Sequence, residues 1–230
     1  MGTSDVPPLV GIAAKARSFL VGEHVRFYFD PVCPWCYQTS RWVRRLRDLG
    51  EIELSWGLFS LELVNAGRGE SMRKGHARSA TSLRTALVVD EELGSAATGD
   101  FYASLGRMVH EEGAAIEEAA TIEAALEDAG LNAVLLHKAL ADDGSWERVS
   151  AQHRALVETT RSFGVPTIAL DGGDGPTIFG PVISRVPSDE DAVELFRHVA
   201  WLARFEDFSE LKRERLTKPD LESVRRRRRA

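Results

Sequence analysis

The sequence contains few cysteines and no excess of positive charge. Its 230 residues include two cysteines, and 29 Lys and Arg stand against 35 Asp and Glu, which gives a formal net charge of −6. Two cysteines exclude a small fold held by several disulfides and a zinc site with four cysteine ligands. The acidic balance argues against a nucleic-acid partner, because contacts to phosphates need clustered Lys and Arg.

Long apolar segments are also missing. No stretch approaches the roughly 18 apolar residues that a membrane-spanning helix needs, so we expect no membrane partner. The N-terminus is a poor signal peptide, because Asp5 precedes the first apolar stretch and Lys15 and Arg17 interrupt it. We therefore expect a cytoplasmic protein. The composition, 43% hydrophobic and 28% charged, is typical of a globular chain with a substantial core.

The sequence pattern places strands and helices at both ends of the chain and only helices in the middle. The expected elements are a strand at 25–29, a helix from Pro34 to about Leu49, a strand-like run at 52–61, a helical block over about 71–144, a helix reaching 163, hairpin strands at 166–170 and 177–179, and a closing helix from 188. We expect Phe196, Val199 and Leu202 to form the buried stripe of that closing helix.

The chemistry of the chain is indicated by Cys33-Pro34-Trp35-Cys36, which lies between a predicted strand and a predicted helix. Cys33 falls where free backbone N–H groups and the helix dipole favour an anion, so we expect its pKa to lie below the free value of roughly 8.5. Cys36, one turn later on the face of Val43 and Leu46, can attack a mixed disulfide formed at Cys33. We predict that Cys33 is the more exposed and more acidic thiol and Cys36 the buried one.

A metal site is the main structural alternative for two cysteines at this spacing. It would need two further ligands, and no other cysteine exists. The histidines that remain show no spacing typical of metal ligands; they include His76, His110, His137 and His153. We therefore favour redox chemistry and expect no metal.

Val165-Pro166-Thr167 begins a predicted strand. Taken alone it could simply separate a helix from a strand. Together with the cysteine motif and this order of elements, it predicts a cis Val165–Pro166 bond that faces Cys33 and Cys36.

These features resemble the DsbA-like thioredoxin superfamily, and within it most closely the mycothiol-dependent nitroreductase (mycoredoxin-type) proteins. CPWC and the predicted cis-proline mark the superfamily, whereas the other motifs are more specific to the subfamily. The matching stretches are FDPVCPWC at 29–36, TSRW at 39–42, SLELVN at 60–65, GVPTI at 164–168, FGPVISRVP at 179–187 and FSELKR at 208–213.

The resemblance implies an α/β, thioredoxin-like fold with an inserted α-helical domain. We assign residues 23–70 and 147–215 to a discontinuous thioredoxin-like domain and 71–146 to the inserted domain. Residues 1–22 and 216–230 are assigned to flexible termini. We further expect the helical block to cover the Cys33 site as a lid.

The resemblance also implies a role for each site residue. Cys33 is the attacking thiolate and Cys36 the resolving thiol. Pro34, Trp35 and Asn65 belong to the substrate site, and backbone beside the cis Pro166, including Val165, holds an extended thiol substrate. No cofactor is expected to stay bound. Mycothiol or another low-molecular-weight thiol is the expected electron donor. The expected substrate is a small molecule or a disulfide, and the protein could form a homodimer.

Two further candidates lie in the helical block. Where relatives place a tyrosine at the start of the insert, this chain has Met72, and a thioether cannot replace a phenol as a proton donor. Met72 thus puts nitroreduction in doubt more than thiol–disulfide exchange. His110 could stabilise a thiolate or donate a proton, or it could be an ordinary packed histidine.

Competing functions remain open at this point. Kappa-type glutathione transferases and 2-hydroxychromene-2-carboxylate isomerases share the architecture but do not need the second cysteine, so Cys36 argues against them. A groove that binds a thiol or peptide without turnover is a third interpretation. The terminal run Arg225 to Arg229 is interpreted as a solvated tail, because the rest of the chain is acidic.

Overall fold

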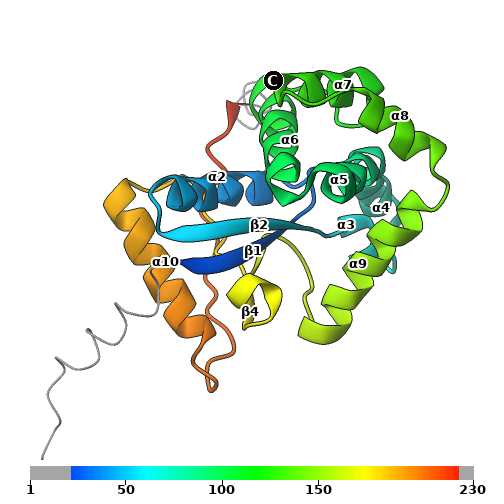
Figure 1. The fold of residues 1–230 in the computed structure, drawn as a ribbon. Coiled ribbons are helices and arrows are strands. Elements are labelled where there is room, and N and C mark those ends of the chain that lie inside the picture. The colour runs from blue at the N-terminus through cyan, green and yellow to red at the C-terminus, as the bar shows by residue number, and fades with distance from the viewer. Residues whose placement is uncertain (1–21, 223–230) are drawn as a thin grey trace, which may run out of the picture.

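The computed structural model describes residues 22–222, in which four strands form one sheet with helices around it (Figure 1). The run Arg225 to Arg229 and the N-terminal residues up to 21 lie outside the described part. The elements are β1 (Glu23–Phe29), α2 (Pro34–Asp48), β2 (Ile52–Leu58), α3 (Leu61–Val64), α4 (Glu70–Ala77), α5 (Ala80–Leu93), α6 (Ser95–Arg107), the π-turn η1 (Met108–Glu112), α7 (Ala119–Asp128), α8 (Val134–Ala141), α9 (Ser145–Thr160), β3 (Thr167–Ala169), the 3₁₀ turn η2 (Asp171–Gly173), β4 (Thr177–Phe179) and α10 (Asp189–Ala203).

The sheet joins the two ends of the chain. Its strand order is β2-β1-β3-β4, with β1 parallel to β2 and antiparallel to β3, and β3 antiparallel to β4. The inner strand β1 buries Val25, Phe27 and Phe29 on one face, whereas His24, Arg26 and Tyr28 on the other face are exposed or half-buried. This alternation is typical of a strand that packs on the core with one face. Helices α4 to α8 lie between β2 and β3 in sequence, so the mixed α/β fold with a helical insert is confirmed.

Helix α2 has the buried face that the sequence predicts. Cys36, Val43 and Leu46 are fully buried on it, and Trp42 packs with them. The indole N–H of Trp42 donates to the Ala192 carbonyl oxygen at 3.1 Å. This bond ties α2, which begins at the cysteine motif, to α10.

Two details of the expected elements are wrong. The buried residues of α10 are Ala192, Phe196 and Ala200, whereas Val199 and Leu202 are only partly buried. Spacing by four positions puts two small alanines and Phe196 on one buried face of α10, and Phe196 and Ala192 contact Trp42 of α2. The second strand ends at Leu58 and not near 61, because the Ser60 hydroxyl accepts a hydrogen bond from the Leu63 amide and caps α3.

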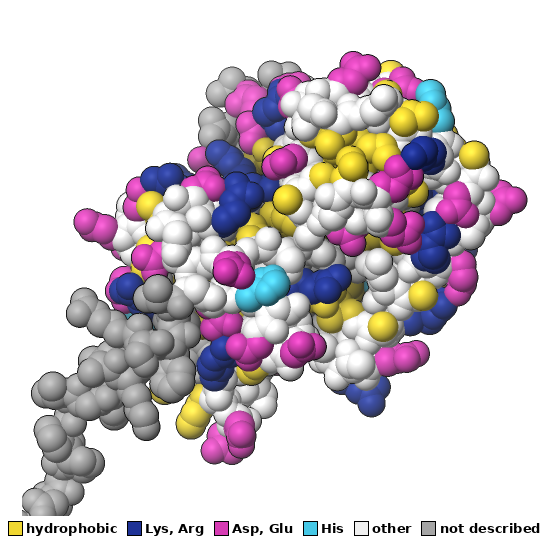
Figure 2. Space-filling view, in the orientation of Figure 1, with side chains coloured by type: hydrophobic (Ala, Val, Ile, Leu, Met, Phe, Trp, Pro, Cys, Tyr) yellow, Lys and Arg dark blue, Asp and Glu magenta, His cyan; other side chains and the backbone are white. Residues whose placement is uncertain are grey.

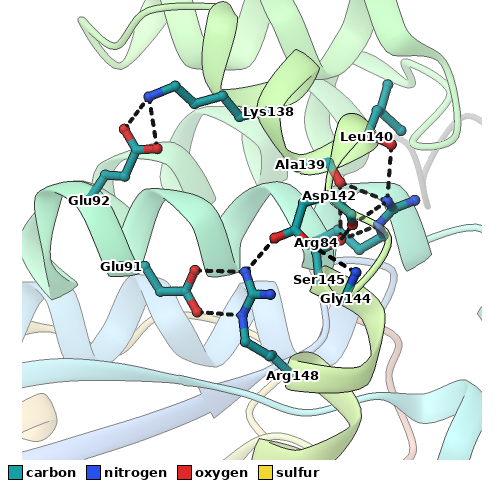
Figure 3. Close-up of polar contacts among 10 residues, drawn as sticks. All are labelled: Arg84, Glu91, Glu92, Lys138, Ala139, Leu140, Asp142, Gly144, Ser145 and Arg148. Carbon is teal, nitrogen blue, oxygen red and sulfur yellow. Dashed lines mark hydrogen bonds and ion pairs between the residues drawn. The ribbon is translucent and has the colours of Figure 1, made fainter.

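Ionic contacts hold helices of the insert to α9 and to each other (Figure 3). The Arg84 guanidinium donates to the Ser145 hydroxyl and to the Ala139 carbonyl, both at 2.7 Å. Arg148 pairs with Glu91 at 2.8 Å and with Asp142 at 2.6 Å. Since each guanidinium bridges two chain segments, α5, α8 and α9 are fixed relative to one another.

The surface carries mixed charge. On the face shown in Figure 2, acidic and basic side chains of the described residues are interspersed. Among residues 22–222, no helix combines the length and the apolar content needed to cross a bilayer.

Candidate active site

The cysteine motif occupies the first turn of α2. Cys33 is the N-cap residue and Pro34 the first helical residue, where a missing N–H costs nothing. The Cys36 amide lies 3.4 Å from the Cys33 sulfur and donates to it. Cys33 is half-buried and Cys36 is buried, which confirms the predicted difference in exposure. The helix thus holds the two thiols at different depths, with Cys33 nearer the surface than Cys36.

The Val165–Pro166 segment lies against Cys33. Its peptide bond is cis, as the sequence predicts. The Cys33 thiol lies 4.0 Å from the Val165 carbonyl oxygen and donates to it. The start of β3 therefore meets the start of α2 at the reactive sulfur.

The expectation that Cys33 has a lowered pKa is wrong. Burial raises the pKa of Cys33 to about 11 and outweighs the amides of Cys36 and Trp35, which act in the opposite direction. The charge of Asp30 raises this pKa further, whereas the charge of Arg215 lowers it. Position at a helix N-terminus favours an anion, but the loss of water around the sulfur is the larger effect here.

Asp30 is a buried carboxyl group directly before the motif. It accepts hydrogen bonds from the Leu61 amide at 2.8 Å and the Val32 amide at 3.1 Å. Burial raises the pKa of Asp30 to about 6, above its ordinary value, despite these two donors. Asp30 therefore links the motif loop to α3 and adds a negative charge near Cys33 at neutral pH.

The buried thiol has two polar neighbours. The Cys36 thiol donates to the Tyr28 carbonyl oxygen at 3.7 Å. Burial raises the pKa of Cys36 well above its ordinary value, and the nearby hydroxyl of Tyr102, on α6, acts in the opposite direction. That hydroxyl has no hydrogen-bond partner within residues 22–222. A helix of the insert thus contributes a polar group to the inner side of the motif.

The C-terminal segment, residues 204–222, returns to the motif after α10. The Arg215 guanidinium lies 5.3 Å from the centre of the Trp35 ring. Beyond it, the Asp220 amide donates to the Ser184 carbonyl at 2.8 Å, and Leu221 is buried. In Figure 1 this segment runs from orange to red past the sheet toward α6. Residues 217–221 thus make ordered contacts in a range that the sequence assigns to a flexible terminus.

The insert also contacts the loop before Cys33. His110 is buried in η1, and its Nε2 lies 2.8 Å from the Pro31 carbonyl oxygen. The end of α6 and η1 therefore stands beside the cysteine loop, as the lid hypothesis requires, while closure on a substrate stays a prediction.

Two further candidates from the sequence, Asn65 and Met72, lie at the end of α3 and on α4. Asn65 follows α3, and its amide donates to the Leu61 carbonyl at 2.8 Å, so it is connected through Leu61 to Asp30. Met72 lies on α4 with 45% of its side chain exposed. Their roles in binding substrate stay predictions.

Sequence reasoning missed three residues of this site. From the sequence, Asp30 has no role beyond its place in the FDPVCPWC stretch at 29–36. Tyr102 and Arg215 are distant in sequence, and nothing in their local pattern separates them from packing or surface residues. The position of Asp30 next to CPWC was the one usable signal.

Comparisons with known proteins agree with this geometry. The family Rv2466c-like, described as mycothiol-dependent nitroreductase Rv2466c, matches residues 32–213. The uncharacterized protein Rv2286c of Mycobacterium tuberculosis is 32% identical over 191 residues, which cover 82% of this chain and 81% of that protein.

Solved structures show the same fold at low identity. The cytosolic disulfide reductase DsbM from Pseudomonas aeruginosa, solved with GSH, has a TM-score of 0.55 at 17% identity and covers 77% of this chain and 99% of its own. A 2-hydroxychromene-2-carboxylate isomerase has a TM-score of 0.56 at 18% identity and covers 79% and 96%. The DsbA-like fold is therefore shared by enzymes of different chemistry.

Proposed function

The chain belongs to the Rv2466c-like family of mycothiol-dependent nitroreductases and is a thiol oxidoreductase, and from this we propose that it works through a Cys33–Cys36 dithiol with mycothiol as its reductant. The observation that carries the proposal is the pairing of a half-buried sulfur with a buried one in the same helical turn. The cis Pro166 segment beside Cys33 supports it, because its Val165 carbonyl offers an edge for an extended substrate.

The proposed exchange needs only the substrate disulfide as oxidant and mycothiol as reductant. The Cys33 thiolate attacks one sulfur of a substrate disulfide, a mixed disulfide forms, and the first thiolate leaves with the electron pair. Cys36 then attacks the Cys33 sulfur, which closes the Cys33–Cys36 disulfide and releases the second thiol. Two mycothiol molecules restore the dithiol and become mycothiol disulfide.

We propose nitro compounds as a more specific substrate class. Reduction of a nitro group to a nitroso group consumes two electrons and two protons and releases one water, and oxidation of the dithiol supplies both. We further propose that Trp35 and Asn65 contact the substrate. Because Met72 stands where relatives have a tyrosine, we expect slow nitroreduction with thiol exchange retained.

An insulin-reduction assay with mycothiol tests the exchange. We expect turnover by the native chain and none by Cys33→Ser. Turnover in Cys33→Ser would contradict the role of Cys33. No turnover in the native chain would contradict the proposal and favour a groove that binds thiols without chemistry. For the nitro substrate, Met72→Tyr should raise the rate of nitroaromatic reduction, and an unchanged rate would remove position 72 from the mechanism.

Cys36 is the residue that argues against the isomerase alternative. The likeness to a 2-hydroxychromene-2-carboxylate isomerase is one of fold, and the buried second cysteine is what argues for dithiol chemistry. We propose the cytoplasm as the location, where a low-molecular-weight thiol can keep the pair reduced.

A further inference from the structure

The inner side of the cysteine motif contains a hydroxyl group with no partner. Tyr102 is fully buried, and its hydroxyl has no hydrogen-bonding partner in the described part of the chain. Its ring is stacked on Phe29 with centroids 4.0 Å apart and lies 6.4 Å from the ring of Tyr37. Tyr102 therefore packs against the chain neighbours of Tyr28 and Cys36, the two residues joined by the Cys36 thiol contact. A buried hydroxyl without a hydrogen-bond partner lowers the stability of the fold. We therefore expect a state of the site in which this hydroxyl gains a partner.

Ionisation of Cys36 provides such a state. As a thiol, Cys36 donates its proton to the Tyr28 carbonyl oxygen. The thiolate has no proton to give, and a carbonyl oxygen cannot donate to it. The unpartnered Tyr102 hydroxyl can donate to it, and the position of the Tyr102 ring beside Phe29 and Tyr37 puts this hydroxyl on the inner side of the motif.

The Arg44 guanidinium lies beside the Tyr102 ring. The Arg44 guanidinium is 4.1 Å from the centre of the Trp56 ring and 5.4 Å from that of Tyr102. Its Nε and Nη2 are buried and have no hydrogen-bonding partner within residues 22–222. Burial lowers the pKa of Arg44 to about 10, which leaves it charged at neutral pH. The charge favours electron density on the Tyr102 oxygen, so the phenol gives up its proton more readily in a hydrogen bond.

Close helix packing makes this arrangement possible. A Cβ atom on Gly106 would lie 2.2 Å from the Tyr37 ring, and one on Gly99 would lie 2.3 Å from Trp56. Two glycines on α6 thus bring the helix close to the cluster that surrounds Arg44, and Tyr102 lies between them in sequence.

We propose that Tyr102 donates a hydrogen bond to the Cys36 thiolate during the resolving step and that Arg44 is the positioning residue that strengthens this donor. The step rests on the proposed dithiol function. Cys36 sulfur attacks the Cys33 sulfur of a Cys33–S–S–R disulfide, the Cys33–Cys36 bond forms, and the S–R thiolate leaves with the electron pair. The proton lost by Cys36 ends on the departing thiol.

The two steps can be separated with Ellman's reagent. Cys33 releases the first coloured thiolate, and resolution by Cys36 releases the second, so stopped-flow absorbance gives two phases. Tyr102→Phe should slow the second phase by about tenfold, the value of a hydrogen bond to a charged group, and leave the first within about twofold. Arg44→Met should slow the second phase by about threefold.

A matched control removes a hydroxyl from the same cluster. The Tyr37 hydroxyl donates to Glu111 at 2.7 Å instead of facing Cys36, and its ring lies 6.4 Å from that of Tyr102. Tyr37→Phe should leave the second phase unchanged. Because Arg44 acts through Tyr102, Arg44→Met should add no further slowing to Tyr102→Phe.

The pH dependence separates this role from a packing role. Besides Tyr102, the charged or titratable groups that act on Cys36 are Cys33 and Asp30. Those that act on Tyr102 are Cys36, Cys33 and Arg44. In Tyr102→Phe the midpoint of the second phase should move to higher pH, while that of the first phase stays in place.

The outcomes are decisive in each direction. Equal second phases in native protein and Tyr102→Phe would overturn this inference and leave the dithiol function standing. A native protein that releases one coloured equivalent would refute the dithiol function and this inference with it. Slowing of both phases alike in Tyr102→Phe would also overturn the inference, because it would indicate general disturbance of the site.

Discussion

At the scale of single residues, the reactivity of Cys33 is set by competing effects on one sulfur. Two backbone amides and Arg215 favour the thiolate, and burial and Asp30 oppose it. Burial is the larger effect, so the thiol form of Cys33 predominates at neutral pH. A bound substrate that changes the surroundings of the sulfur would change its reactivity directly.

The raised pKa predicts a particular pH profile. With a pKa of about 11 for Cys33, its alkylation rate should rise about tenfold per pH unit between roughly pH 7 and 10, since the thiolate fraction rises in that proportion. Iodoacetamide labelling of the reduced protein, followed by peptide mass spectrometry, measures this. A plateau near neutral pH would show that Cys33 is a low-pKa thiol, and labelling of Cys36 before Cys33 would reverse their roles.

The cysteine motif is the part of the site that sequence predicts best. The features that predict its structure all lie within a few residues of the Cys33 sulfur. They are the strand before it, the Asp30-Pro31 pair, Pro34 at the helix start and the apolar stripe that includes Cys36. The pKa of Cys33 was predicted in the wrong direction because desolvation comes from elements distant in sequence, which no local pattern reveals. Tyr102 and Arg215 were missed for the same reason.

At the scale of elements, the contact between α6 and α2 sets the distance between the insert and the helix that carries the cysteine motif. Gly106 stands against the Tyr37 ring with no room for a side chain. The sequence shows α6 as an apolar helix, and its helical pattern was predicted, but the need for glycine at this position depends on a partner helix that only the fold identifies.

Gly106→Ala tests that contact. An added Cβ would lie 2.2 Å from the Tyr37 ring, so α6 must shift, and we expect a loss of about 2 kcal/mol in the free energy of unfolding by urea. Gly75→Ala on α4 is the matched control, because its Cβ would meet nothing within 4 Å. That change should leave the chain as stable or slightly more stable. Equal stability of both variants would mean that the α6 contact is looser than described.

The C-terminal segment brings a cation to the cysteine motif. Arg215 lies on Trp35, and its charge lowers the pKa of Cys33. Contacts at Asp220 and the buried Leu221 hold the segment in place. This segment therefore belongs to the electrostatics of the site and not only to the end of the chain.

Arg215→Met should raise the pKa of Cys33 and slow its alkylation about threefold at fixed pH, because one positive charge is lost near the sulfur. Since the side chain is exposed, salt should reduce the difference from native protein. Arg213→Met, two positions earlier and also exposed, is the control and should react at the native rate. A difference that salt does not change would point to packing on Trp35 instead of charge.

At the scale of the whole molecule, the two ends of the chain build one sheet and the middle builds the helical block. Order alone predicted this, because neither the β1–β2 half nor the β3–β4 half completes a sheet. The sequence also predicts that the insert lies over the motif, and His110 of the insert contacts Pro31 in the loop before Cys33. It does not predict that Tyr102 lies on the inner side of the motif or that Arg215 of the C-terminal segment reaches Trp35.

The central claim is that Cys33 forms the mixed disulfide with mycothiol and that Cys36 resolves it. The most direct test is the intact mass of Cys36→Ser after exposure to mycothiol disulfide, with peptide mapping of the product. The account predicts one stable mycothiol adduct, located on Cys33, and none on the native protein after resolution. An absence of adduct on Cys36→Ser, or an equally stable adduct on the native protein, would contradict it.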